Sequence, residues 1–277
     1  MRKRWVLGSL AIVYGLAIVF LHDWFVQLSI KVMNHFSLLV YNVLVRNFSL
    51  SIGALVLGFC SWKVFLNKRF DLLFFLFILL ALLVLHWLFL FEMNIEIIHA
   101  LEFGLLALLL YGATCNAGAA VILCLPFMLI DEWVQYSLLY GNYNKYYEFN
   151  DLVLDILGAG LAILVLKIIE KERKTVLLPF WKRNEYRVLF VLLIFFCVLV
   201  LSGVLAAHQS QVNTYTIFTL SRIDAPELFW QTHAFTGAKY HILAPLPGAF
   251  IMFVLCVLLG CIDYSFIQKW PKDRHLK

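Results

Sequence analysis

Eight apolar runs, each of roughly 20 residues, divide the 277-residue chain. About 20 apolar residues in a helix cross the hydrocarbon core of a bilayer. Because lipid offers no hydrogen-bond partners to the backbone, such runs must form helices, and none shows the alternating pattern of a barrel strand. With 63% hydrophobic and 14% charged residues, the composition is far from that of a soluble domain. The sequence therefore predicts an all-α, polytopic membrane helix bundle.

The eight predicted spans are residues 5–21, 50–65, 70–91, 97–113, 119–139, 151–169, 188–207 and 247–267. The stretch 24–46 is also apolar, but polar residues such as Gln27, Lys31 and Asn42 interrupt it. We expect this stretch to form an amphipathic helix that lies in the membrane interface or packs on the bundle.

The distribution of Lys and Arg tests this assignment. With both termini in the cytoplasm, 17 of the 22 Lys and Arg residues fall on the cytoplasmic side, where such an excess is expected. A ninth span at 24–46 would move either residues 2–4 or the basic stretch 167–187 to the outside. Eight spans with both termini cytoplasmic is the better prediction, and it places 11 of the 17 acidic residues on the outer side.

Three polar clusters lie at one depth near this predicted outer face. They are Glu96, His99 and Glu102; Asp131, Glu132 and Gln135; and Asp151 and Asp155. A charge in hydrocarbon costs about 2.5–17 kcal/mol, so ionisable groups there indicate a functional site. Because residues three or four positions apart share a helix face, we expect the clusters to converge in one polar cavity. Gly158 and Ala162 continue the face of the two aspartates and predict close helix packing behind them.

The same residues resemble the pattern of the VanZ-like family of membrane proteins. The resemblance rests on Glu96-x-x-His99, on the stretch Asp131-Glu132-Trp133-Val134-Gln135, and on Asp151-x-x-x-Asp155-x-x-Gly158. It covers residues 70–169, a core of four spans. Residues 1–69 are then N-terminal spans with the interfacial helix, and residues 170–277 are a two-span extension with an outer loop at 208–246.

Two departures from the family pattern stand within this core. Asp155 occupies the position where the family carries asparagine, which adds a negative charge. The arginine that the family places between the glutamine and the first aspartate is absent, and Lys145 is the only basic residue near that position. Either departure points to a different substrate or an altered site.

The resemblance implies a multi-pass protein of the bacterial cytoplasmic membrane, in a family whose founding member is linked to teicoplanin resistance. It implies a fold and a location rather than a reaction. The residues expected to carry the chemistry are His99, Asp131, Glu132, Gln135, Asp151 and Asp155, with Glu96, Glu102 and Lys145 as substrate contacts.

Three functions remain open. The first is an enzyme that acts at the outer leaflet on an envelope lipid, a lipid-linked glycan or a cell-wall precursor, with His99 as acid and base. Crowded carboxylates must share protons or bind a cation, so Asp131, Glu132 and Asp151 would orient His99 or hold a divalent cation. The second is a non-catalytic protein that binds glycopeptide or a partner through its outer loops. The third is a transporter with the acids as a proton or cation relay.

Structural explanations compete with each of these functions. Asp151 could cap a helix, His99 could be a hydrogen-bonded core histidine, and His233 and His241 could belong to an ordinary polar loop rather than to a metal site. We expect membrane lipids as partners and no nucleic acid, and the oligomeric state stays open.

Overall fold

The structure, a computed structural model, describes residues 2–140, 145–170, 182–224, 228–233 and 237–265. Eight of its helices are long and apolar enough to cross a membrane. They are α1 (Arg2–Phe36), α2 (Leu38–Asn67), α3 (Phe70–Phe89), α4 (Ile97–Thr114), α5 (Ala117–Val134), α6 (Phe149–Ile169), α7 (Asn184–Leu201) and α8 (Pro245–Ser265). The chain is therefore an all-α, multi-pass membrane protein, as the apolar runs predict.

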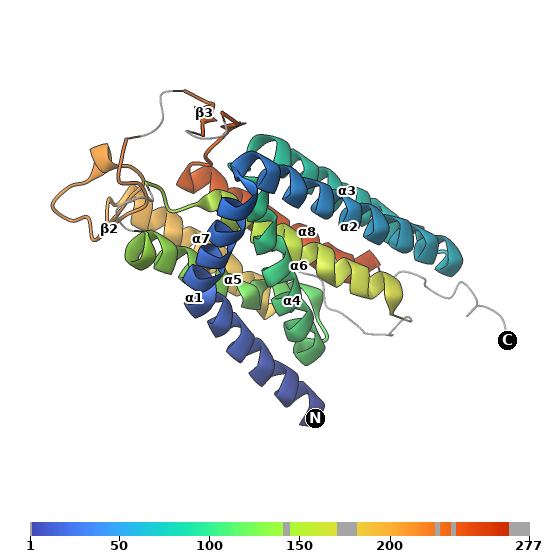
Figure 1. Ribbon diagram of the computed structural model, residues 1–277. Coiled ribbons are helices and arrows are strands. Elements are labelled where there is room, and N and C mark those ends of the chain that lie inside the picture. The colour runs from blue at the N-terminus through green and yellow to red at the C-terminus, as the bar shows by residue number, and fades with distance from the viewer. Residues whose placement is uncertain (1, 141–144, 171–181, 225–227, 234–236, 266–277) are drawn as a thin grey trace.

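The prediction of a separate interfacial helix at 24–46 is wrong. Residues 24–36 continue α1, residues 38–46 begin α2, and the chain turns between them at Ser37, whose φ is 71°. At 1.5 Å per residue, α1 is roughly 50 Å long. The two helices form a hairpin whose turn lies at the top of the bundle in Figure 1, and from there the arms diverge: α1 runs down to the N-terminus and α2 runs to the right beside α3.

Some of the polar residues that suggested an interfacial helix bind other parts of the fold. The side-chain oxygen of Asn42 accepts a hydrogen bond from the Asn94 N–H at 2.9 Å, and the Asn42 carbonyl accepts one from Asn94 Nδ2 at 3.0 Å. Ser29 Oγ and the Tyr41 hydroxyl are 2.7 Å apart and join the two arms. The hydrogen bonds of Asn42 therefore hold the hairpin of α1 and α2 against the 3₁₀ turn η1 (Asn94–Glu96).

The most buried helix, α6, lies at the centre of the bundle and crosses α4 at small residues. A Cβ atom on Gly158 would collide with the backbone of Ala100, and one on Gly104 would lie 3.3 Å from the Ala162 Cβ. The close packing predicted from Gly158 and Ala162 is thereby confirmed. It holds His99, the neighbour of Ala100, against the face of α6 that carries the aspartates.

The segment between α7 and α8 covers one end of the bundle (Figure 1). Its two small sheets pair β1 (Leu205–Ala206) with β2 (Phe218–Thr219) in parallel, and β3 (Gln231–Thr232) with β4 (Lys239–Tyr240) antiparallel. The backbone N–H of Tyr147 donates to the Leu220 carbonyl at 2.9 Å, and that of His241 donates to the Phe89 carbonyl at 2.7 Å. The segment therefore joins the end of α3 to the residues that begin α6.

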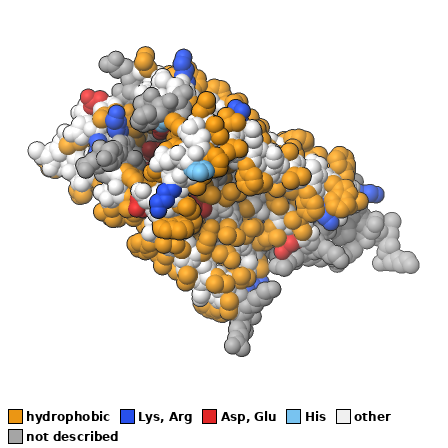
Figure 2. Space-filling view, viewed as in Figure 1, with side chains coloured by type: hydrophobic (Ala, Val, Ile, Leu, Met, Phe, Trp, Pro, Cys, Tyr) orange, Lys and Arg blue, Asp and Glu red, His pale blue; other side chains and the backbone are white. Residues whose placement is uncertain are grey.

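The surface of the bundle is hydrophobic over most of the face seen in Figure 2, and charged side chains are few there. Leu55 of α2 is 74% exposed and Phe195 of α7 is 57% exposed. A contiguous apolar surface of this kind is unfavourable in water and favourable against lipid. The exposed helix faces therefore support a membrane environment for the bundle.

Candidate functional site

His99 of α4 lies between two carboxylates of α6. Its Nδ1 is 3.3 Å from Asp155 Oδ1, and its Nε2 is 3.7 Å from Asp151 Oδ2. All three side chains are buried. Both ring nitrogens of His99 therefore face an acid, an arrangement in which either nitrogen can hold or release a proton.

A second polar pair forms where α5 ends. Gln135 Nε2 donates to Asp131 Oδ2 at 3.0 Å, as their spacing of four residues predicts. Gln135 also begins the π-helical turn η2 (Gln135–Leu139), which closes with the Tyr140 N–H donating to the Gln135 carbonyl at 2.9 Å. Single π turns of this kind often occur at functional sites.

The sequence analysis missed His22 of α1. Its Nδ1 lies 3.7 Å from Asp131 Oδ1, and its ring centroid is 5.8 Å from that of His99. His22 thus links the Asp131–Gln135 pair to His99. The available signal was the pair His22 and Asp23, which interrupts an apolar region. Because the predicted first span ends at residue 21, this pair fell in the gap after it.

Glu132 points away from Asp131 toward the start of α6. Its Oε1 accepts a hydrogen bond from the Glu148 N–H at 2.8 Å, and the side chain is buried. The two adjacent acids thus serve different places: Asp131 faces His22, and Glu132 holds the backbone that leads into α6.

Three residues were predicted as substrate contacts: Glu96, Glu102 and Lys145. Glu96 Oε1 accepts from the N–H groups of Glu92 and Met93 at 2.9 and 2.6 Å, which fixes the turn before α4. Glu102 is half-buried one turn after His99. Lys145 is exposed, and its backbone carbonyl accepts a hydrogen bond from the Arg222 N–H at 2.8 Å. The structure therefore does not bring Lys145 to the other residues.

A cavity of about 530 Å³ opens beside His99. Its walls are formed by His22, Phe25, Val26, Ser29, Ile30, Met33, Tyr41, Met93, Ile95, Glu96, Ile98, His99, Glu102, Gln135, Tyr140, Glu148 and Asp151. Asp131, Glu132 and Asp155 lie behind this wall. The size is within the range of small-molecule sites, so five of the nine predicted site residues line one ligand-sized cavity.

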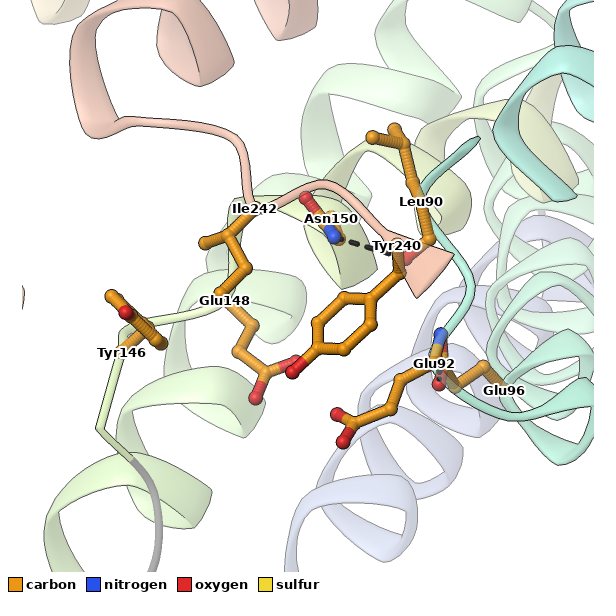
Figure 3. A pocket seen from close by; sticks show the side chains of 8 residues that line it. All are labelled: Leu90, Glu92, Glu96, Tyr146, Glu148, Asn150, Tyr240 and Ile242. Atoms are coloured by element: carbon orange, nitrogen blue, oxygen red, sulfur yellow. Dashed lines mark hydrogen bonds between the residues drawn. The ribbon is translucent and has the colours of Figure 1, made fainter. Parts of the chain in front are cut away.

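A smaller cavity of about 30 Å³ adjoins it, lined by Glu92, Glu148 and Tyr240 among others. Figure 3 shows these three side chains pointing toward one another. Glu96 and Glu148 line both cavities. Burial, together with the nearby charges of Asp151 and Glu92, raises the pKa of Glu148 to about 8.

The strand-bearing segment reaches this smaller cavity through Tyr240 and His233. His233 Nε2 lies 3.5 Å from Glu92 Oε1, and burial raises the pKa of that carboxyl. His241 instead stacks on Phe229 with ring centroids 3.9 Å apart. Sequence reasoning singled out neither Glu148 nor Tyr240, because their roles depend on segments that meet only in the folded chain.

Several buried polar atoms of the site have no hydrogen-bond partner among the described residues. They are His99 Nδ1, Asp131 Oδ1, Asp151 Oδ1 and Asp155 Oδ1. His99 Nδ1 and Asp155 Oδ1 face each other at 3.3 Å and Asp131 Oδ1 faces His22 Nδ1 at 3.7 Å, so of the four atoms only Asp151 Oδ1 has neither a hydrogen bond nor an ion pair among the described residues. A buried acceptor left without a partner costs about 1–3 kcal/mol, and buried polar groups in a purely structural network are usually satisfied. This pattern favours a functional cluster over structural packing, since proteins depart from such local rules mainly at functional sites.

The described part of the chain contains no group of three or more His, Cys, Asp or Glu residues placed to hold a metal ion. His99, Asp151 and Asp155 thus form a histidine–carboxylate cluster whose side chains are not arranged as a set of metal ligands.

Fold and site together define a multi-pass membrane protein in which a buried histidine–carboxylate cluster adjoins a largely apolar cavity. In comparisons with known proteins, no family model, no curated protein and no solved structure matches the chain. The resemblance to VanZ-like proteins therefore rests on the motif residues and their spacing.

Proposed function

We propose that the chain is a VanZ-like enzyme of the bacterial cytoplasmic membrane that acts at the outer leaflet on an envelope lipid or a lipid-linked cell-wall precursor. The observation that supports this proposal most directly is the position of His99, held between Asp151 and Asp155 at the wall of a cavity whose other wall is apolar. A membrane-borne substrate needs both walls, because its chain is apolar and its reacting head is polar.

In this proposal His99 accepts a proton from the reacting head and returns it later in the reaction. Asp155, behind the ring, orients the imidazole, while Asp151 lines the cavity and balances the positive charge that forms on His99. Asp131, which accepts a hydrogen bond from Gln135, orients His22 in the same way. Proton sharing among these groups also avoids the cost of several ionised carboxylates in a region of low dielectric.

The consequence for the cell would be a changed susceptibility to glycopeptides such as teicoplanin, because the proposed substrates belong to the envelope that these antibiotics target. Sequence-based topology supports an outer-leaflet site, since it places the three clusters on the side poor in Lys and Arg.

A second candidate is a non-catalytic protein that binds an envelope amphiphile or glycopeptide. The size of the cavity and its mixed lining favour this candidate, because neither property requires chemistry. The two candidates differ in what they require of His99: catalysis needs its proton transfer, and binding needs only its shape and polarity.

The experiment compares His99→Gln and Asp155→Asn with His35→Gln, an exposed histidine near the end of α1. Glycopeptide susceptibility of a bacterial host and the Tm of the purified protein are measured for each variant, and susceptibility is corrected for the amount of folded protein. We expect activity per folded molecule to fall about 100-fold or more in the first two variants and not to change in the control. Tm should be unchanged or higher in Asp155→Asn, because this variant removes one of the crowded acids.

Two other outcomes would contradict the proposal. Variants that melt early yet keep normal activity per folded molecule would show that the cluster is structural. Normal activity and normal Tm in His99→Gln would favour the binding protein, since the amide retains polarity but transfers no proton at neutral pH.

A further inference from the structure

The large cavity has two unlike walls. Residues 25–33 of α1 contribute an apolar wall with Phe25, Val26, Ile30 and Met33. The rest of the lining carries four carboxylates together with His99 and Gln135, and also the apolar side chains Met93, Ile95 and Ile98. Those carboxylates belong to Glu96, Glu102, Glu148 and Asp151. The shape and lining fit a ligand that has a hydrocarbon chain at one end and a polar head at the other.

The charge of the polar wall selects the kind of head. Among the described residues that line the cavity there is no Lys or Arg, and the only basic side chains are His22 and His99. Asp131 and Asp155 add two further acids behind this wall. A phosphate would meet carboxyl oxygens here and lack the guanidinium or ammonium donors that proteins use to bind it. An ammonium group would instead find acceptors, and its positive charge would favour the ionised form of the carboxyls beside it.

One acid of this wall also has an unused acceptor. Asp151 Oδ2 faces His99 at 3.7 Å, whereas Asp151 Oδ1 is buried and has no hydrogen-bond partner in the described part of the chain. A donor carried by the ligand would satisfy it, and a charged N–H donor would do so most strongly. Tyr41 and Tyr140 add aromatic rings to the same cavity, and such rings attract ammonium groups.

We infer that the cavity binds an amphiphile with an ammonium headgroup, the head lying among Glu102, Glu148 and Asp151 and the chain lying along residues 25–33 of α1. This inference rests on the proposed function and names its substrate class: a membrane lipid or lipid-linked precursor whose reacting head carries an amine.

The first test uses a photoreactive primary alkylammonium probe with a diazirine in its chain, applied to the purified protein in maltoside micelles. We expect the label on residues 25–33. A dodecylammonium competitor should suppress labelling at a concentration at least tenfold lower than dodecyl phosphate, with or without Mg²⁺. Tetramethylammonium, which has no chain, should not compete. Equal or better competition by dodecyl phosphate, or a label confined to other helices, would overturn the inference.

Variants of the two walls provide the second test. Glu102→Gln should weaken probe binding about tenfold, and Val26→Trp should abolish labelling because the indole fills the apolar wall. Asp71→Asn and Val13→Trp change an acid and an exposed valine that do not line the cavity and should leave labelling unchanged. Tm is measured for all four variants. Ser29→Phe replaces Val26→Trp if the latter does not fold, and full labelling in both cavity variants would contradict the inference.

The outcomes separate this inference from the proposed function. Labelling that persists in His99→Gln, in a variant that has lost activity, supports both. A preference for dodecyl phosphate combined with loss of activity in His99→Gln refutes the ammonium ligand and leaves the enzyme standing. Selective ammonium labelling combined with full activity in His99→Gln refutes the enzyme and leaves the ligand standing.

Discussion

Gly158 of α6 lies directly against the backbone of Ala100 on α4, with no room for a Cβ atom between them. Because Ala100 follows His99, this contact sets how closely the imidazole approaches the carboxylates of α6. The geometry of the site therefore depends on a glycine that belongs to neither cavity. Helix packing through small residues is common in membranes, where backbones approach closely at such positions.

Gly158→Ala should separate α4 from α6 and destabilise the protein by about 1–3 kcal/mol, the usual cost of overpacking. It should also reduce activity per folded molecule, because His99 moves away from Asp151 and Asp155. Tm and susceptibility assays measure the two effects. Gly53→Ala is the matched control, since a Cβ atom at this helical glycine meets nothing within 4 Å. Equal behaviour of the two variants would show that the contact does not determine the site.

Stability should fall as the pH rises from about 5 to 8, with Glu148 as a main cause. The folded protein raises the pKa of this carboxyl from 4.5 to about 8, because the side chain is buried beside Asp151 and Glu92, and the charge of His99 only partly opposes the shift. Between these two values the folded state holds a proton that the unfolded state releases, so the contribution to stability is present at low pH and is lost as the pH approaches 8.

Glu148→Gln should therefore flatten the dependence of Tm on pH and raise Tm at pH 8 by about 2 °C or more. The amide mimics the protonated acid at every pH. Asp224→Asn changes an exposed carboxylate outside both cavities and serves as the control. A Tm profile for Glu148→Gln that is identical to that of the unmodified protein would contradict the role given to this residue.

Asn150 should hold the segment between α7 and α8 on the bundle. Its Nδ2 donates to the carbonyls of Leu90 and His241 at 3.0 and 2.8 Å, and its Oδ1 accepts from the Leu243 N–H at 3.0 Å. Asn150→Ala removes all three bonds and leaves partly buried partners unsatisfied, at up to about 1–3 kcal/mol for each unsatisfied group.

We expect Asn150→Ala to lower Tm by several degrees and to speed protease cleavage within residues 203–244 by tenfold or more. Limited proteolysis with mass spectrometry of the fragments measures this effect. Asn47→Ala, at an exposed position of α2, provides the control. Unchanged cleavage in Asn150→Ala would show that other contacts suffice to hold the segment.

Topology has its own prediction. Reporter fusions after Lys68 should report the cytoplasm, and fusions near Lys145 and Thr214 should report the outside, because the positive-inside rule governs orientation. The structure adds that residues near Lys145 and Thr214 belong to one end of the bundle, since the Arg222 N–H binds the Lys145 carbonyl. A cytoplasmic signal at Lys145 would place the whole site on the inner side and overturn the outer-leaflet proposal.

The sequence alone determined the class of fold and much of the polar cluster. Lipid leaves the backbone of a 20-residue apolar run no alternative to a helix, so the number of spans follows from composition along the chain. Within a helix the spacing of side chains is fixed, so pairs such as Asp131 with Gln135 and Asp151 with Asp155 could be assigned before any tertiary contact was known.

Only the tertiary structure decided which helix faces meet. His22, Glu92 and Glu148 joined the site because α1, the turn before α4 and the residues that lead into α6 converge there, and spacing along one helix carries no information about another. The sequence likewise left the end of α1 undetermined. Polar residues in an apolar stretch end a span if only water can satisfy their hydrogen bonds, but the helix continues if the fold supplies partners. Asn42 has such a partner in Asn94, and so residues 24–46 became the two arms of a hairpin whose first arm forms the apolar wall of the cavity.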